Sequence, residues 1–262
     1  MVERGHVGRP RCALLGRRYA LPLARILSAK LLSTGLRSLH LSDVHLRSFK
    51  ASSDGPFLWH FPHLTTLFLT SITVGNSASA VFSSTDFLLN ALSLPVLATL
   101  CYTWDSKYSS PPTLTHLGPQ LSSLYLSRTI PTNATTCLWP SLPDLSPCIN
   151  LSHLSLDIRV PLDFDVLALV PHPLKTLRID ATRNAIETIE AALFESGAEC
   201  LEEVERLELP RSNERRSETA LKRREETREW CFQRRVELVE RNGGEDVEDQ
   251  VAMRWVEMVE RR

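Results

Sequence analysis

The sequence has little of what most enzymes and membrane proteins need. Ten glycines in 262 residues leave few phosphate-cradling loops, and no G-x-G-x-x-G, G-x-x-x-x-G-K-[ST], G-x-S-x-G or H-E-x-x-H motif occurs. No apolar run approaches the roughly 20 residues of a membrane-spanning helix. The formal net charge of −1 gives the whole chain no pull toward nucleic acid or anionic lipid. We therefore expect no enzyme, no cofactor or metal, and no nucleic-acid or membrane partner.

The six cysteines are scattered and include no C-x-x-C pair. This usage favours reduced, mostly buried thiols in a cytoplasmic or nuclear protein. Residues 1–30 contain seven basic residues and one acid. An arginine-rich, acid-poor start is compatible with mitochondrial import, whereas a basic capping segment over residues 1–33 is the simpler interpretation.

Leucines recur in a fixed spacing, L-x-x-L-x-L, in which the first, fourth and sixth positions are apolar. The chain has 43 leucines, so an all-leucine copy is expected about once by chance, yet five occur. We set aside the copy at Leu89, Leu92 and Leu94, which runs into Pro95. Seven copies remain when conservative replacements are counted; they begin at Leu36, Leu64, Leu97, Leu121, Leu151, Leu174 and Val204.

This spacing predicts short parallel strands. Alternate residues of a strand point to opposite faces, so the fourth and sixth positions face a core and the fifth faces away from it. A single strand cannot bury its leucines, but stacked units can form a continuous core. The predicted fold is an α/β solenoid over residues 34–211, with strands on the concave side and short helices and loops on the convex side. Helices are predicted over 84–95, 163–171 and 183–197.

On these seven triplets, residues 34–211 resemble the leucine-rich-repeat family. The family's asparagine or cysteine, three residues past the sixth position, is missing. That place holds Val44, Ile72, Asp105, Thr129, Arg159, Thr182 and Ser212. Together with the uneven spacing, this is similar to fungal F-box/leucine-rich-repeat proteins. The resemblance implies a substrate-recognition part of an F-box-type ubiquitin-ligase adaptor, with Skp and cullin components as partners. Residues 21–27 faintly match the start of an F-box, which we interpret as absent or degenerate.

Residues 212–262 form a charged tail. Residues 195–262 carry 33 of the chain's 61 charged residues. The pattern predicts one long helix that ends at Gly243-Gly244, with Phe232, Val236 and Val239 on one stripe, and a second helix. The second helix has an apolar stripe of Val247, Val251, Trp255 and Val259. The two helices are expected to cap the solenoid, to pack on each other or to bind a partner.

The fifth positions are expected to form the concave face. They are His40, Phe68, Cys101, Tyr125, Ser155, Arg178 and Glu208. An exposed aromatic cluster with charged neighbours is typical of a protein-binding site. The candidate partner-binding residues are Phe68, Trp104, Tyr125, Arg128, His153, Asp157, Arg178 and Asp180. In a competing interpretation, Trp104 and Phe68 fill gaps between irregular coils.

The predicted function is therefore that of a non-enzymatic module that presents a concave surface to another protein, whose identity the sequence does not give. A degenerate repeat protein with a structural role and no specific partner is the alternative.

Overall fold

The structure is a computed structural model. It describes residues 12–15, 35–42, 45–46, 59–70, 73–74, 89, 92–105, 114–129, 143–158, 170, 173–181, 199–210, 218–241 and 253–258. None of the helices in these segments has the length and apolar character needed to cross a membrane.

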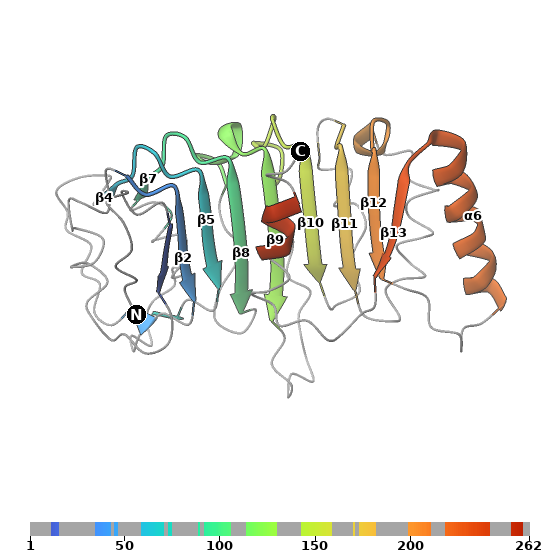
Figure 1. Ribbon diagram of the computed structural model, residues 1–262, viewed down its shortest axis with the longest axis horizontal. Helices are drawn as coiled ribbons and strands as arrows, with labels where there is room; N and C mark the ends of the chain where they lie inside the picture. Colours follow the sequence, from blue (N-terminus) through green and yellow to red (C-terminus); the bar gives the residue numbers. More distant parts are fainter. Residues whose placement is uncertain are drawn as a thin grey trace, which may run out of the picture.

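A nine-stranded parallel sheet runs the length of the molecule, with its strands side by side in chain order (Figure 1). The strands are β1 (Cys12–Leu15), β2 (Ser38–Ser42), β5 (Thr66–Thr70), β8 (Thr99–Asp105), β9 (Ser123–Thr129), β10 (His153–Ile158), β11 (Thr176–Ala181), β12 (Arg206–Pro210) and β13 (Glu237–Arg241). Two short parallel pairs join β3 (His45–Leu46) to β6 (Thr73–Val74) and β4 (Trp59–His60) to β7 (Leu92–Ser93).

Helices are few in the described segments. They are the 3₁₀ helices η1 (Gly118–Gln120) and η2 (Glu199–Leu201), the α-helix α6 (Glu218–Arg234) and a C-terminal helix of residues 253–258. The predicted α/β class with a parallel sheet is confirmed.

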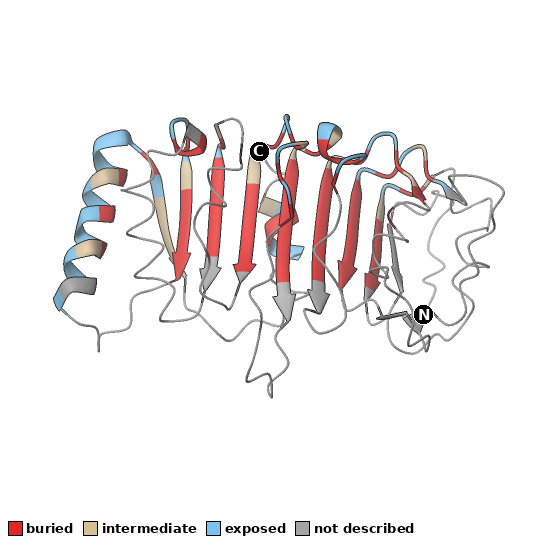
Figure 2. Cartoon of the chain, turned by 180° about the vertical axis from the view of Figure 1, so that it is seen from behind, coloured by how far each residue is buried: buried red, intermediate tan, exposed pale blue. Residues whose placement is uncertain are grey.

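The register of the sheet follows the leucine triplets. The fourth-position leucine of each strand lies beside that of the next, as Leu100 lies beside Leu124 and Leu124 beside Leu154. The fourth- and sixth-position residues from β2 to β12 are buried in one hydrophobic cluster, which also holds the first-position residues. Figure 2 shows the strands buried along most of their length. The main core therefore lies on one face of the sheet, where the spacing placed it.

A tight turn leads the chain into most strands. The backbone N–H of a first-position residue donates to the carbonyl three residues earlier, as from Leu64 to Phe61, Leu97 to Leu94 and Leu121 to Gly118. Proline occupies the second position of these three turns, where its fixed φ favours a type I or II turn. Pro95 therefore belongs to a turn that precedes β8.

The predicted helices lie mostly outside the described residues. The segment 183–197 is wholly outside them, and of 163–171 they include Val170 alone. The prediction over 84–95 is wrong at its end. Leu89 is helical, but Leu92–Ser93 forms β7 and the turn at Pro95 follows directly. Apolar residues with helical spacing followed by a proline are typical of a helix end, but here the proline belongs to a turn between two strands.

The tail also differs from its prediction. The first helix ends at Arg234 and not at Gly243-Gly244, and Glu237–Arg241 continues the sheet as β13. Phe232 is 80% exposed and does not share a buried stripe with Val236. Residues 253–258, in contrast, are helical as predicted. Because β1 and β13 both pair within the sheet, the sheet crosses the predicted boundaries at residues 33 and 212.

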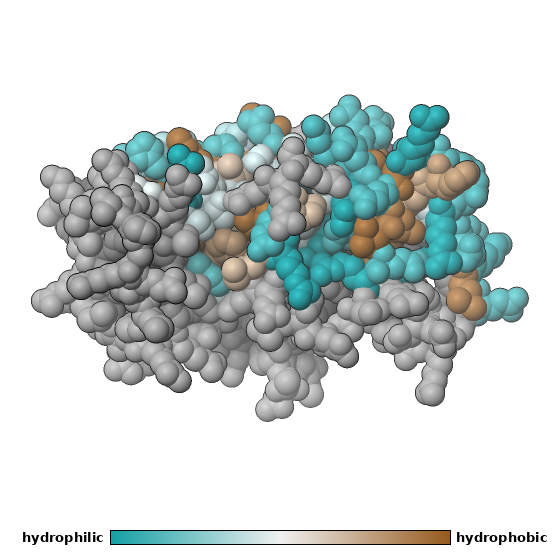
Figure 3. All heavy atoms as spheres, viewed as in Figure 1, coloured by the Kyte–Doolittle hydropathy of each residue, from teal (hydrophilic) through white to brown (hydrophobic). Residues whose placement is uncertain are grey.

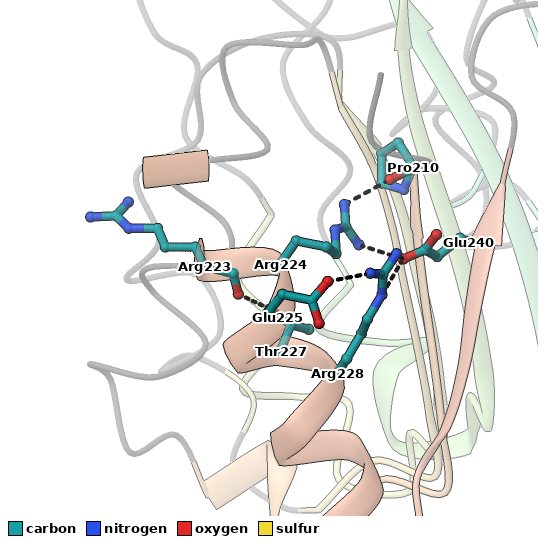
Figure 4. Close-up of polar contacts among 7 residues, drawn as sticks. All are labelled: Pro210, Arg223, Arg224, Glu225, Thr227, Arg228 and Glu240. Carbon is teal, nitrogen blue, oxygen red and sulfur yellow. Dashed lines mark hydrogen bonds and ion pairs between the residues drawn. The ribbon is translucent and has the colours of Figure 1, made fainter. Parts of the chain in front are cut away.

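Glu240 explains how α6 attaches to β13. It occupies the core-facing place beside Leu209, and it accepts hydrogen bonds from Arg228 at 3.2 and 2.9 Å (Figure 4). The buried guanidinium of Arg224 lies 3.9 Å from Glu240 and donates to the carbonyl of Pro210 at 2.9 Å. An ionic contact thus replaces leucine packing at the last strand, and α6 covers this end of the sheet (Figure 1).

Candidate protein-binding face

The face of the sheet opposite the main core, here called the strand face, is built from the third, fifth and seventh positions of the triplet units, which lie in successive strands. Its central row consists of the fifth positions, which the register aligns one beside the next. The row runs His40, Phe68, Cys101, Tyr125, Ser155, Arg178, Glu208 and Val239. Its chemistry changes along the sheet, from aromatic and apolar at β5–β9 to charged at β11–β12.

The apolar part of this row forms a second hydrophobic cluster. Phe68, Cys101 and Tyr125 are buried in it together with Trp255 and Val256, and Met258 packs against them. The two tail residues belong to the C-terminal helix, which lies over the centre of the sheet in Figure 1. The chain's own C-terminal segment therefore covers the predicted binding surface. At the N-terminal side of the cluster, the rings of His40 and Phe68 lie 5.0 Å apart at an angle of 35°.

A polar group borders the apolar part. The hydroxyl of Tyr125 donates to Oδ2 of Asp157 at 3.2 Å, and the hydroxyl of Ser127 donates to the same oxygen at 3.4 Å. The guanidinium of Arg178 lies 5.8 Å from the centre of the Tyr125 ring. Burial, and then the charge of Asp157, raise the pKa of Tyr125 far above its usual range. Tyr125 is thus a neutral hydrogen-bond donor at the edge of the cluster.

An ion-pair network forms the charged end of the strand face. Arg206 contacts Glu208 at 2.7 Å and both carboxylate oxygens of Glu237 at 3.0 Å, and Arg241 lies 3.5 Å from Glu208. Figure 3, which has the same view as Figure 1, shows hydrophilic residues around small apolar areas. No group of His, Cys, Asp or Glu in the described part of the chain could hold a metal ion.

The predicted site residues divide into two sets. Phe68, Tyr125, Asp157 and Arg178 come together on the strand face, and His153 lies half-buried at the start of β10 on the same face. The register pairs Trp104 with Arg128 and Asp157 with Asp180. Trp104 and Arg128 have the strand parity of the core leucines, whereas Asp180 has that of Asp157. The side chains of Trp104, Arg128 and Asp180 lie outside the described residues.

The expected exposure of the aromatic cluster is wrong. Tyr125 is fully buried and Phe68, Asp157 and Arg178 are nearly so. The physical reason on the apolar side is the docked tail, because Trp255 and Val256 cover Phe68, Cys101 and Tyr125. Sequence reasoning found the apolar stripe of Trp255 but did not assign it to this surface.

Comparison with protein-family models found no match, and comparisons with curated proteins and with solved structures found none either.

Proposed function

We propose that this protein is a non-enzymatic protein-interaction module of the leucine-rich-repeat type, a solenoid that uses its strand face to bind another protein. The parallel register of the triplets supports the repeat architecture. Backbone hydrogen bonds between successive units support it as well. The N–H of Ser122 donates to the carbonyl of Ala98, and that of Ser152 donates to the carbonyl of Ser122, each at 2.9 Å. Every coil contacts mainly the next, which is how such stacks hold together.

One observation carries the binding proposal. The strand face at β5–β9 already holds a protein segment, the C-terminal helix, through the buried side chains of Trp255 and Val256. A surface that buries a tryptophan in one cluster with a phenylalanine and a tyrosine has the aromatic groups typical of binding hot spots. The neighbouring hydrogen-bonded and charged groups can orient a polypeptide there.

A narrower proposal is that the bound partner is a substrate of an F-box-type ubiquitin ligase and that Skp and cullin subunits join the complex. The resemblance of the triplets and their uneven spacing support it. The segment 21–27, which carries the faint F-box similarity, lies outside the described residues.

The test is site-specific photo-cross-linking in cells with the full chain. A photoreactive residue replaces His153, which is half-buried on the strand face, and in a matched control it replaces Phe232, which is exposed on α6. We expect the His153 position to cross-link a defined partner that the Phe232 position does not capture. Equal or absent cross-linking from the two positions would contradict the proposed binding face.

The ubiquitin link is tested separately with purified Skp adaptor and the full chain. Complex formation in size-exclusion chromatography is expected if the chain acts in a cullin ligase. If the two proteins elute separately, the ligase role is contradicted, whereas the general binding function stays in place.

A further inference from the structure

We propose that the strand face at Phe68, Cys101 and Tyr125 binds a partner's short amphipathic helix, with a tryptophan beside an aliphatic residue as its anchor. We infer from the same contacts that residues 253–258 occupy this site as a releasable internal competitor. This inference rests on the proposed binding function and adds the partner's chemistry and its regulation. It starts from the fact that Trp255 and Val256 share one buried cluster with the three strand residues.

The dimensions of helix and surface agree. Phe68, Cys101 and Tyr125 stand on three adjacent strands, which spans about 10 Å at the usual strand spacing. The six helical residues 253–258 are about 9 Å long at 1.5 Å per residue. A helix is about 10–12 Å wide with its side chains, so one short helix is wide enough to cover all three strands.

The surface also fits the chemistry of the helix. Phe68 supplies an apolar ring and Tyr125 supplies a second ring whose hydroxyl is held by Asp157. Cys101 lies between them with a small side chain, which leaves room for a large indole. Outside the anchor, Met253, Arg254 and Glu257 are exposed on the helix. A partner helix thus needs an apolar anchor on one side and tolerates polar residues on the other.

Two features make the internal helix displaceable. The indole Nε1 of Trp255 is buried, and it has no hydrogen-bond partner among the described residues. An unsatisfied buried donor costs about 1–3 kcal/mol, so a partner that satisfies a donor here binds with an advantage. Helices this short are also marginal without packing, so the segment loses its fold when it leaves the surface.

Cys101 reports release of the tail in the full chain, because it is buried in the same cluster as Trp255 and Val256. Native protein is treated with iodoacetamide, and each cysteine is quantified by peptide mass spectrometry. Trp255→Ala is expected to raise the labelling rate of Cys101 by about tenfold or more. The matched control Met253→Ala changes an exposed residue of the same helix and is expected to leave the rate unchanged.

Cys148 is the internal folding control, because burial raises the pKa of its thiol to about 12 and it lies in the main core. It is expected to stay protected in both variants. Protection of Cys101 in Trp255→Ala would overturn the proposal. Simultaneous labelling of Cys101 and Cys148 would also overturn it, because the tail would then be part of the folding core.

Binding in trans is measured with a fluorescent synthetic peptide of residues 245–262 and the full-length proteins. Trp255→Ala protein is expected to bind the peptide about tenfold more tightly than wild type, because a tethered competitor acts at millimolar effective concentration. The same peptide with Trp255→Ala is expected not to bind. Equal affinity of both proteins, or no binding to either, would overturn the internal competitor. A wild-type dimer that Trp255→Ala abolishes would identify a second copy as the occupant and would overturn it as well.

The two proposals fail in different ways. The labelling and peptide experiments require no cellular partner. Their failure would contradict the proposed helix-binding site, while cross-linking from His153 could still succeed. Failure of cross-linking together with success of the peptide experiment would show a self-binding tail without a partner.

Discussion

Leu124 and Tyr125 are consecutive residues in β9 that belong to different hydrophobic clusters on opposite faces of the sheet. Both are fully buried. A strand that is covered on both faces has no solvent-facing row at its centre, which is the usual condition of parallel sheets. At the residue scale, the two faces therefore differ in what packs on them: residues of the turns that precede the strands on one side, and the C-terminal helix on the other.

Leu124→Asp should unfold the middle of the sheet. Leu124 lies between Leu100 and Leu154, and an aspartate there would be a buried charge without an opposite charge. The cost of several kcal/mol is a large share of the 5–15 kcal/mol that stabilises a typical domain. Thermal melting followed by circular dichroism should show loss of the native transition. The matched control is Leu221→Asp, at an exposed position of α6, where melting should change little. An unchanged melting curve for Leu124→Asp would refute the assigned register.

At the scale of elements, the chain enters most strands through a tight turn, and one of these turns has a strict spatial limit. A Cβ built on Gly118 would lie 2.8 Å from the carbonyl carbon and the Cβ of Pro147 in the next coil. Because the contact includes backbone, a flexible side chain cannot move away to relieve it. Glycine at this position thus permits two neighbouring coils to approach each other.

Gly118→Ala should therefore destabilise the fold by about 1–3 kcal/mol through overpacking between these coils. The free energy of unfolding in urea measures the effect. His116→Ala, at an exposed position just before Gly118, should lie within about 0.5 kcal/mol of wild type. Similar stability of Gly118→Ala and His116→Ala would show that the coils can separate without cost.

A second prediction at this scale concerns the attachment of α6. Glu240→Gln weakens the charge-assisted contacts with Arg228 and Arg224, and we expect a loss of about 1–2 kcal/mol in urea unfolding. The control is Glu225→Gln, which contacts Arg228 at 2.6 Å but is 70% exposed. Surface ion pairs contribute little, so this change should cost less than about 0.5 kcal/mol. Equal losses in the two variants would mean that the lower exposure of Glu240, 23% against 70% for Glu225, adds nothing to the pair.

These elements also show what the sequence could predict. The triplets located the strands from β2 to β12 because two or three leucines per coil must be buried and their spacing has the period of a strand. The triplet pattern did not predict β13, because Arg235 and Glu240 occupy two of its leucine positions. An ionic contact with α6 replaces apolar packing there. The strand face was placed correctly for Phe68 and Tyr125. That Trp255 covers them is a contact between distant parts of the chain, which local spacing does not encode.

At the scale of the whole molecule, the sheet is a linear array. Each strand pairs with the strands next to it in the order, so the middle strands have two neighbours and the end strands β1 and β13 have one (Figure 1). The C-terminal helix is the exception to this neighbour-only pattern, because it returns from beyond β13 to the centre.

Hydrogen–deuterium exchange should reveal this linear organisation. Amides of β8, β9 and β10 are expected to exchange most slowly, since they have paired strands on both sides and covered faces, and those of β1 and β13 are expected to exchange fastest. Glu240→Gln should accelerate exchange in β12 and β13 and leave β5 unchanged, because four strands separate β5 from β12 in the sheet order. Trp255→Ala should instead accelerate exchange at β5, β8 and β9, whose side chains it covers. Uniform acceleration of every strand by Glu240→Gln would mean that the array unfolds as one unit, and the neighbour-only description of its stability would then be wrong.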